Sequence, residues 1–258
     1  MIKKFKVTVP LAKGTEERTA YIYLPASYEY KEQKHYPVLY MFDGHNLFFD
    51  SDATFGKCWG LKEFMDRTKK QLIIVAVDCN HSPDHGRLQE YSPFDFTNEN
   101  GDTIIGRGKT TMDWFVTELK KEIDQTYRTL PERKHTFIAG SSMGGLMSLY
   151  ALLEYNHVFS KAAALSPSLW VHRKKIKEMI QKASLLPNTT LYIDYGSEEF
   201  SNHNEMKDVF VETLFELTKH DIYLNSRIVP NGTHCEASWE KQIPFFMNTL
   251  LYDTRTKK

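Results

Sequence analysis

Two kinds of hydrophobic pattern alternate along most of this 258-residue chain. Short, nearly continuous apolar runs are typical of strands that are covered on both faces of a sheet. Six such runs occupy residues 38–42, 72–77, 136–139, 162–165, 191–193 and 222–229. Segments with helical periodicity lie between them, and this alternation predicts a mostly parallel sheet with helices on both faces.

The helical segments carry apolar stripes with a spacing of three and four residues. The clearest stripe consists of Met112, Phe115, Val116, Leu119 and Ile123. Similar stripes cover 206–217 and 239–250, and each predicts a helix with one buried face.

The N-terminal region has a different pattern. Residues 5–9 and 19–24 are rich in β-branched and aromatic residues, with a turn signal at Gly14 between them. They predict an antiparallel pair of strands. The fold class is therefore α/β, a mostly parallel, doubly wound sheet with antiparallel N-terminal strands, and we expect residues 1–258 to form one domain.

The segment 78–110 has no regular period and is rich in Asn, Asp, Pro and Gly. A loop of this length is uncommon in a compact domain and is more often found over an active site. We therefore expect it to cover the substrate site. Arg87 and Glu90 within it could form an ion pair that fixes the loop, or could be exposed charges.

Charge excludes some classes of partner. The chain has 33 Lys and Arg against 33 Asp and Glu, so its net charge is zero and nothing indicates binding of nucleic acid or an acidic membrane. It also lacks the apolar run of about 18 residues that a membrane-spanning helix needs. Cys58, Cys79 and Cys235 form an odd set without metal-ligand spacing, which indicates a reducing compartment and a cytoplasmic location.

One short motif raises the question of a metal. His81 and His85 are spaced i, i+4 with Asp84 between them, but the segment is predicted to be a loop and no third ligand stands at motif spacing. Solvated side chains explain these residues better. We therefore expect no metal and no organic cofactor.

The strongest chemical signal is Gly140-Ser141-Ser142-Met143-Gly144, a GxSxG sequence between a predicted strand and a predicted helix. In a nucleophile elbow the central serine occupies a strained turn above the sheet, and the glycines let the flanking backbone approach closely. This context identifies Ser142 as the candidate nucleophile. The N–H of Met143, at the start of the helix, would stabilise negative charge developing beside it.

A serine nucleophile needs a base, and in this fold the order along the chain is serine, acid, histidine. Of the histidines after Ser142, only His220 and His234 lie far enough along the chain. His220 ends a predicted helix, where a cation has an ordinary structural role. His234 lies between the last predicted strand and the last helix, which favours it as the base.

The acid is expected in the loop after the preceding strand, where three carboxylates compete. Asp194 lies within the strand itself. Glu198 and Glu199 follow Gly196 at the carboxyl end, where catalytic groups gather in α/β sheets. We favour Glu199 and keep Glu198 as the alternative.

These motifs together resemble the esterase D-like family of α/β-hydrolases, which contains tributyrin, feruloyl, acetyl-xylan and siderophore esterases. The resemblance runs through most of the chain. It rests on Tyr36 to Gly44, on Arg87 with Glu90-Tyr91-Ser92-Pro93, on Gly140 to Gly145, on Ser166-Pro-Ser-Leu-Trp170 and on Gly232-Thr-His234 to Trp239.

The resemblance implies more about the site. It places the acid three residues after Gly196, which is Glu199. It also implies a second oxyanion donor after the third strand, but here Asp43-Gly44-His45 stands where many relatives have His-Gly, so the donor is the backbone N–H of His45 or of Asn46.

The expected function is that of a serine carboxylesterase acting on a small-molecule ester, with Ser142, Glu199 and His234 as the triad. The same triad would serve a siderophore trilactone esterase, an acyltransferase or a thioesterase, and a catalytically silent binding protein is the non-enzymatic alternative. The candidate pocket residues are Trp59, Arg87, Tyr91 and Trp170, although both tryptophans could equally be core residues.

Overall fold

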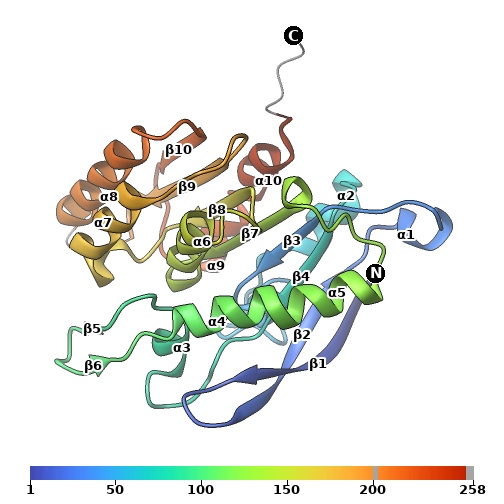
Figure 1. The fold of residues 1–258 in the computed structure, drawn as a ribbon, viewed down its shortest axis with the longest axis horizontal. Helices are drawn as coiled ribbons and strands as arrows, with labels where there is room; N and C mark the ends of the chain where they lie inside the picture. The colour runs from blue at the N-terminus through green and yellow to red at the C-terminus, as the bar shows by residue number, and fades with distance from the viewer. Residues whose placement is uncertain (200–202, 254–258) are drawn as a thin grey trace.

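The computed structural model describes residues 1–199 and 203–253 and is built around an eight-stranded sheet (Figure 1). The strands are β1 (Ile2–Pro10), β2 (Thr15–Tyr23), β3 (Val38–Met41), β4 (Ile73–Val77), β7 (Thr136–Ser141), β8 (Lys161–Leu165), β9 (Thr190–Gly196) and β10 (Tyr223–Val229). Their order in the sheet is β1-β2-β4-β3-β7-β8-β9-β10. The β1–β2 and β2–β4 pairs are antiparallel and the other five are parallel. The predicted fold class is confirmed.

Helices cover both faces of the sheet. The main helical elements are α2 (Leu61–Thr68), α4 (Gly108–Trp114), η2 (Phe115–Leu119), α5 (Lys120–Thr126), α6 (Met143–Glu154), α7 (Arg173–Lys182), α8 (His203–Leu217), α9 (Glu236–Glu240) and α10 (Ile243–Leu251). The short elements are α1 (Ser27–Tyr30), η1 (Gly44–Asn46), α3 (Gly86–Glu90), η3 (Arg133–His135) and η4 (Leu169–Val171).

The sheet divides the core into two layers, and each layer is covered by helices. One hydrophobic cluster contains the buried side chains of α4 to α8, and the other contains those of α2, α9 and α10. Successive residues of a strand point to opposite faces, so Tyr40 enters the first cluster while Leu39 and Met41 enter the second. This two-sided burial explains why the central strands appear in the sequence as continuous apolar runs.

Three predicted elements differ from the structure. The stripe over 239–250 is divided between α9 and α10, because Pro244 is the second residue of α10 and cannot donate to a preceding helical turn. β10 lies at the edge of the sheet and alternates between partly buried and exposed residues, so it is not covered on both faces. Segment 78–110 contains α3 and a small hairpin of β5 (Phe96–Thr97) and β6 (Thr103–Ile104).

One buried and one partly buried ion pair hold segment 78–110 against the sheet. Arg18 of β2 donates to both carboxylate oxygens of Glu90 at 2.7 and 2.6 Å. Arg87 donates to both carboxylate oxygens of Asp43 at 2.7 Å. Neither alternative considered from the sequence, an Arg87–Glu90 pair or two exposed charges, is found, because each residue has a partner of opposite charge on the sheet side of the segment.

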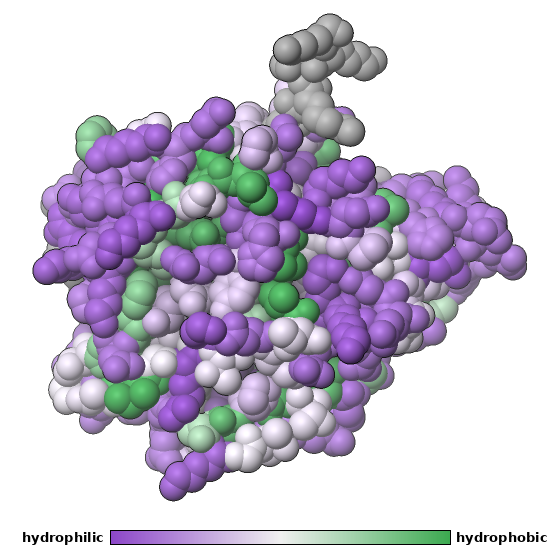
Figure 2. All heavy atoms as spheres, viewed as in Figure 1, coloured by the Kyte–Doolittle hydropathy of each residue, from purple (hydrophilic) through white to green (hydrophobic). Residues whose placement is uncertain are grey.

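The surface gives no sign of a single large apolar patch on the face seen in Figure 2, where hydrophilic residues predominate and hydrophobic ones form small areas. Within the described part of the chain, no helix is both long enough and apolar enough to cross a membrane.

The Arg18–Glu90 pair should contribute strongly to stability, because its side chains are only 4% and 7% exposed. Replacing one partner leaves the other charge buried and poorly compensated. We expect Glu90→Gln to lower the free energy of unfolding at pH 8 by about 3 kcal/mol in urea denaturation.

Glu17, which lies on β2 next to Arg18, provides a matched control. It pairs with Lys6 at the surface, where the Glu17 side chain is 69% exposed and the Lys6 side chain is 58% exposed. Glu17→Gln should change the free energy of unfolding by less than about 0.5 kcal/mol. Equal effects of the two substitutions would show that the buried pair does not anchor the segment.

Candidate active site

The three predicted triad residues all follow parallel strands at the carboxyl edge of the sheet. Ser142 follows β7, Glu199 follows β9 and His234 follows β10. The carboxyl ends of parallel strands meet at one edge, where α/β proteins bind ligands. The sheet therefore collects residues that lie far apart in the sequence.

Ser142 occupies the turn between β7 and α6 with φ 57° and ψ −123°, a conformation that costs a non-glycine residue energy. Gly140 permits this turn, because a Cβ atom there would lie 2.7 Å from the backbone of Gly144. The turn is also held from outside. Ser142 donates its N–H to the Leu165 carbonyl, and its own carbonyl accepts from Ser168, both at 3.0 Å.

Glu199 has a side chain that is only 1% exposed and accepts three hydrogen bonds. Its Oε2 lies 3.0 Å from Nδ1 of His234. Its Oε1 accepts the backbone N–H of Gly196 at 2.6 Å and the hydroxyl of Ser166 at 2.5 Å. Glu198 is exposed, so of the two glutamates it is Glu199 that contacts the histidine.

His234 also has an aromatic neighbour. The ring meets Trp239 of α9 edge-on, with centroids 5.1 Å apart. The indole N–H of Trp239 donates to the Ser166 hydroxyl at 3.0 Å. Ser166 thus links the acid and the aromatic neighbour of the histidine, and it comes from the same loop as Ser168, which is bonded to the Ser142 backbone.

Asp194, the third acid considered from the sequence, has a separate role. Its carboxylate accepts the backbone N–H of Ser166 at 3.0 Å and the hydroxyl of Tyr192 at 2.8 Å. Burial raises the pKa of Asp194 to about 7, and the hydrogen bonds from Tyr192 and Ser166 oppose this shift. Asp194 therefore supports the Ser166 loop from behind.

A second strained turn lies after β3. Asp43 has φ 54° and ψ 50°, and the bidentate contact with Arg87 holds its carboxylate in place. The Asp43 N–H donates to the hydroxyl of Tyr91 at 3.3 Å. Tyr91 is 1% exposed. Arg87 and Tyr91 thus contact this turn, and the structure gives Tyr91 almost no surface for the substrate contact expected from the sequence.

The two tryptophans occupy different environments. Trp59 is 2% exposed and packs against Trp239 and Phe246, so it is a core residue and offers a substrate almost no surface. Trp170 is 37% exposed and meets the ring of Phe96 edge-on at 5.7 Å. Of the two, Trp170 keeps an accessible face near segment 78–110.

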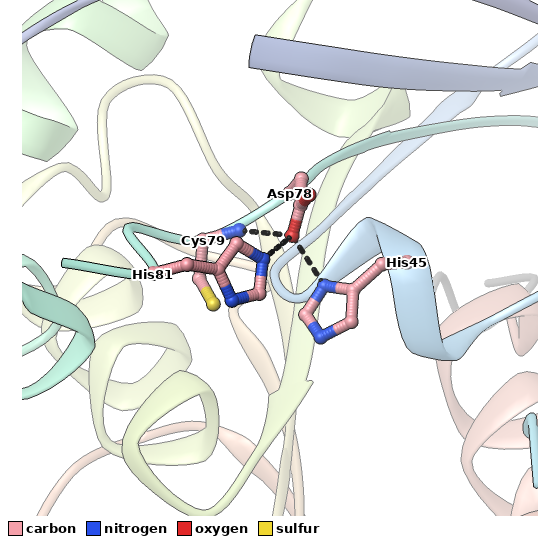
Figure 3. A group of neighbouring side chains, drawn as sticks. All are labelled: His45, Asp78, Cys79 and His81. Carbon is pink, nitrogen blue, oxygen red and sulfur yellow. Dashed lines mark hydrogen bonds and ion pairs between the residues drawn. The ribbon is translucent and has the colours of Figure 1, made fainter. Parts of the chain in front are cut away.

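Sequence reasoning assigned no role to several residues of this region. Ser166 and Ser168 belong to a motif noted in the sequence, but no pattern predicted their contacts. The hydroxyl of Ser166 contacts Glu199, and the hydroxyl of Ser168 lies 3.4 Å from Ser142 Oγ. The histidine pair considered for a metal also separates in space. His85 contacts Asp102, whereas His81 joins His45, Asp78 and Cys79 in a cluster of potential ligands (Figure 3).

Comparison with known proteins places the chain in a family. Residues 13–249 match the model of the family described as "Putative esterase". The chain belongs to this esterase family. The resemblance inferred from the motifs is thereby confirmed.

Three individual proteins are similar to the chain over more than two thirds of its length. The chain is 26% identical over 181 residues to the protein YbbA of Bacillus subtilis (strain 168), covering 69% of this chain and 67% of YbbA. An IroE-like serine hydrolase from Shewanella oneidensis has a TM-score of 0.75 at 20% identity, over 97% of this chain and 79% of the other. A ferulic acid esterase has a TM-score of 0.69 at 18% identity, over 97% of each chain. These similarities confirm the α/β-hydrolase fold.

The buried Asp194 should make stability depend on pH. Its pKa in the folded protein, about 7, exceeds the value of about 3.9 for an unfolded chain. As pH rises between these values, Asp194 loses its proton in the unfolded state before it does so in the folded state. The free energy of unfolding that this group contributes below about pH 4 is therefore lost as pH rises toward 7. We expect Asp194→Asn to flatten the decline in the free energy of unfolding over this range.

The measurement is urea denaturation at several pH values from about 4.5 to 7.5. Asp84→Asn removes an exposed carboxylate and should leave the slope as in the wild type. An unchanged slope in Asp194→Asn would assign the pH dependence to other groups.

Proposed function

We propose that this protein is a serine carboxylesterase in which Ser142, His234 and Glu199 form the catalytic triad. The observation that carries the proposal is the 3.0 Å contact between Glu199 and His234, joined through the Ser166–Ser168 loop to a serine in the conformation of a nucleophile elbow. The family assignment supports the same reaction class.

The chemistry follows from the hydrogen bonds of His234. When Nδ1 donates its hydrogen to Glu199, Nε2 keeps a lone pair and can accept the Ser142 hydroxyl proton. Ser142 Oγ then attacks the ester carbonyl carbon. The C–O bond to the alcohol breaks, and His234 returns the proton to the leaving alcohol. A water molecule, activated by the same histidine, hydrolyses the acyl-enzyme and releases the carboxylic acid.

The tetrahedral oxyanion needs preorganised donors. Met143 is the first residue of α6, and the first N–H groups of a helix have no intrahelical acceptor. On the other side, Asn46 donates its N–H to the Asp43 carbonyl at 2.9 Å. Because this hydrogen bond occupies the N–H of Asn46, we favour the N–H of His45 as the second oxyanion donor. Arg87 and Tyr91 then act as positioning residues for the turn that carries it.

Segment 78–110 is proposed as one wall of the substrate site. Phe94 meets His172 edge-on at 6.1 Å, and Phe96 meets Trp170 at 5.7 Å. These contacts bring the segment beside the chain that follows Ser168. The exposed face of Trp170 is the best candidate for contact with an ester.

The free cysteines Cys58, Cys79 and Cys235 favour a cytoplasmic location.

Ser142→Ala should lower ester hydrolysis by at least about 10³-fold while leaving the melting temperature near that of the wild type. The assay is a series of p-nitrophenyl esters from acetate to palmitate, with feruloyl, acetyl-sugar and catecholate-siderophore esters to define the substrate class. Ser141→Ala is the control, since Ser141 is the buried last residue of β7.

A fluorophosphonate probe should label Ser142 in the wild type. Labelling at Ser141, or full activity in Ser142→Ala, would exclude the proposed nucleophile. Probe labelling without hydrolysis of any ester in the series would instead indicate an acyl-transfer or thioester substrate.

Glu199→Gln should lower kcat/KM by about 10²- to 10⁴-fold, because an amide cannot hold the imidazolium charge or fix the same tautomer. Glu198→Gln should retain activity within about twofold, because Glu198 is exposed and does not contact His234 in the structure. Steady-state kinetics on p-nitrophenyl acetate compare the two. The opposite ranking would transfer the role of the acid to Glu198.

A further inference from the structure

Four potential metal ligands converge between the turn after β3 and the first residues after β4. They are the side chains of His45, Asp78, Cys79 and His81, and their ligand atoms all lie within 4.8 Å of one another (Figure 3). Three are contributed by one short segment of irregular chain, and His45 faces them from the short helix η1. None of the four belongs to the triad.

Asp78 is the centre of this cluster. Its Oδ1 lies 2.5 Å from Nδ1 of His45 and 2.8 Å from Nε2 of His81, and it also accepts the backbone N–H of Cys79 at 2.8 Å. In Figure 3 both imidazole rings point toward this oxygen. Two imidazole nitrogens thus converge on one carboxylate oxygen.

The buried ring of His45 has one nitrogen directed into the cluster and the other held from outside it. The residue is 5% exposed, and its Nδ1 has no aligned hydrogen-bond partner among the described residues despite the short contact with Asp78. Its other ring nitrogen, Nε2, lies 2.9 Å from Thr54 Oγ1. When Nε2–H donates to Thr54, the Nδ1 lone pair is directed at the Asp78 carboxylate, and either a proton or a metal ion can occupy the position between them.

The same arrangement is the usual one for a metal-ligating histidine, whose second ring nitrogen is held by a hydrogen-bond partner. A set of two imidazoles, one thiolate and one carboxylate suits zinc, and cobalt is its usual spectroscopic substitute. The set is less suited to calcium or magnesium, which prefer oxygen ligands.

We propose that His45, Asp78, Cys79 and His81 form a binding site for one zinc-class divalent ion. Bonds of about 2.0–2.3 Å to a tetrahedral ion require ligand atoms about 3.3–3.8 Å apart. Ligand atoms that are now up to 4.8 Å apart must therefore move closer together to bind the ion. The Asp78 and His45 atoms, now 2.5 Å apart, must move slightly apart. His81 can adjust, because its side chain is 60% exposed.

The site would link two parts of the proposed enzyme. His45 belongs to the turn expected to supply an oxyanion N–H, and Asp78 to His81 open the segment expected to cover the substrate. An ion held by both would fix the turn relative to the segment. Metal binding itself does not depend on the esterase chemistry, so the two proposals can fail separately.

The test is isothermal titration calorimetry of the metal-free full-length protein with Zn²⁺, in the wild type and in Ser142→Ala. We expect one ion per chain in both. His81→Ala and Cys79→Ser should each weaken binding at least about tenfold, and Thr54→Val should weaken it about tenfold through the lost support of His45. Co²⁺ should give a thiolate-dependent visible spectrum that Cys79→Ser abolishes.

Matched controls lie close by. His85→Ala removes a histidine of the same segment that contacts Asp102, and Cys58→Ser removes another buried thiol. Both should bind Zn²⁺ like the wild type. His81→Ala changes an exposed side chain, so it keeps the test valid even if Cys79→Ser disturbs folding.

Two results would overturn the proposal. One is the absence of saturable Zn²⁺ binding up to about 1 mM, far weaker than sites of this ligand type. The other is binding that survives in His81→Ala and Cys79→Ser but is lost in His234→Ala, which would place the ion at the triad.

Discussion

The buried carboxylate of Glu199 is the group on which the arrangement of this site depends. A carboxylate that is only 1% exposed is costly unless hydrogen bonds satisfy it, and here the donors come from the end of β9 and from the loops after β8 and β10. They are the backbone of Gly196, the hydroxyl of Ser166 and the ring of His234. Satisfying this one group therefore fixes the loops after β8, β9 and β10 relative to one another, and Ser168 extends the connection to the Ser142 backbone.

Two turns at the same edge of the sheet carry backbone strain. Ser142 and Asp43 both adopt positive φ values, each at a cost of about 1–3 kcal/mol. Neighbouring groups hold both turns. Hydrogen bonds with Leu165 and Ser168 fix the first, and the bidentate contact with Arg87 fixes the second. Strain that the surroundings hold in place is typical of sites that must present a nucleophile and backbone donors without rearrangement.

Segment 78–110 is bound to the sheet more firmly than an ordinary loop. Glu90 and Arg87 each form a buried or partly buried ion pair with a residue outside the segment, and His81 approaches His45 through Asp78. A change in this segment would therefore affect the turn after β3 as well as any substrate that it contacts. The proposed metal site lies at the connection of His81 to His45 through Asp78, where an ion would join the segment to the turn proposed to supply an oxyanion donor.

The sequence by itself determined the order of strands and helices, the nucleophile turn and the family, because these depend on local periodicity and on motifs of a few residues. It also led to His234 and Glu199, since the order of serine, acid and histidine follows the order of the strands. It did not reveal that Arg87 pairs with Asp43, that Arg18 pairs with Glu90, or that His45 meets His81. These partners are separated by up to 72 residues. They meet because β4 lies between β2 and β3 in the sheet, an arrangement that only tertiary packing decides.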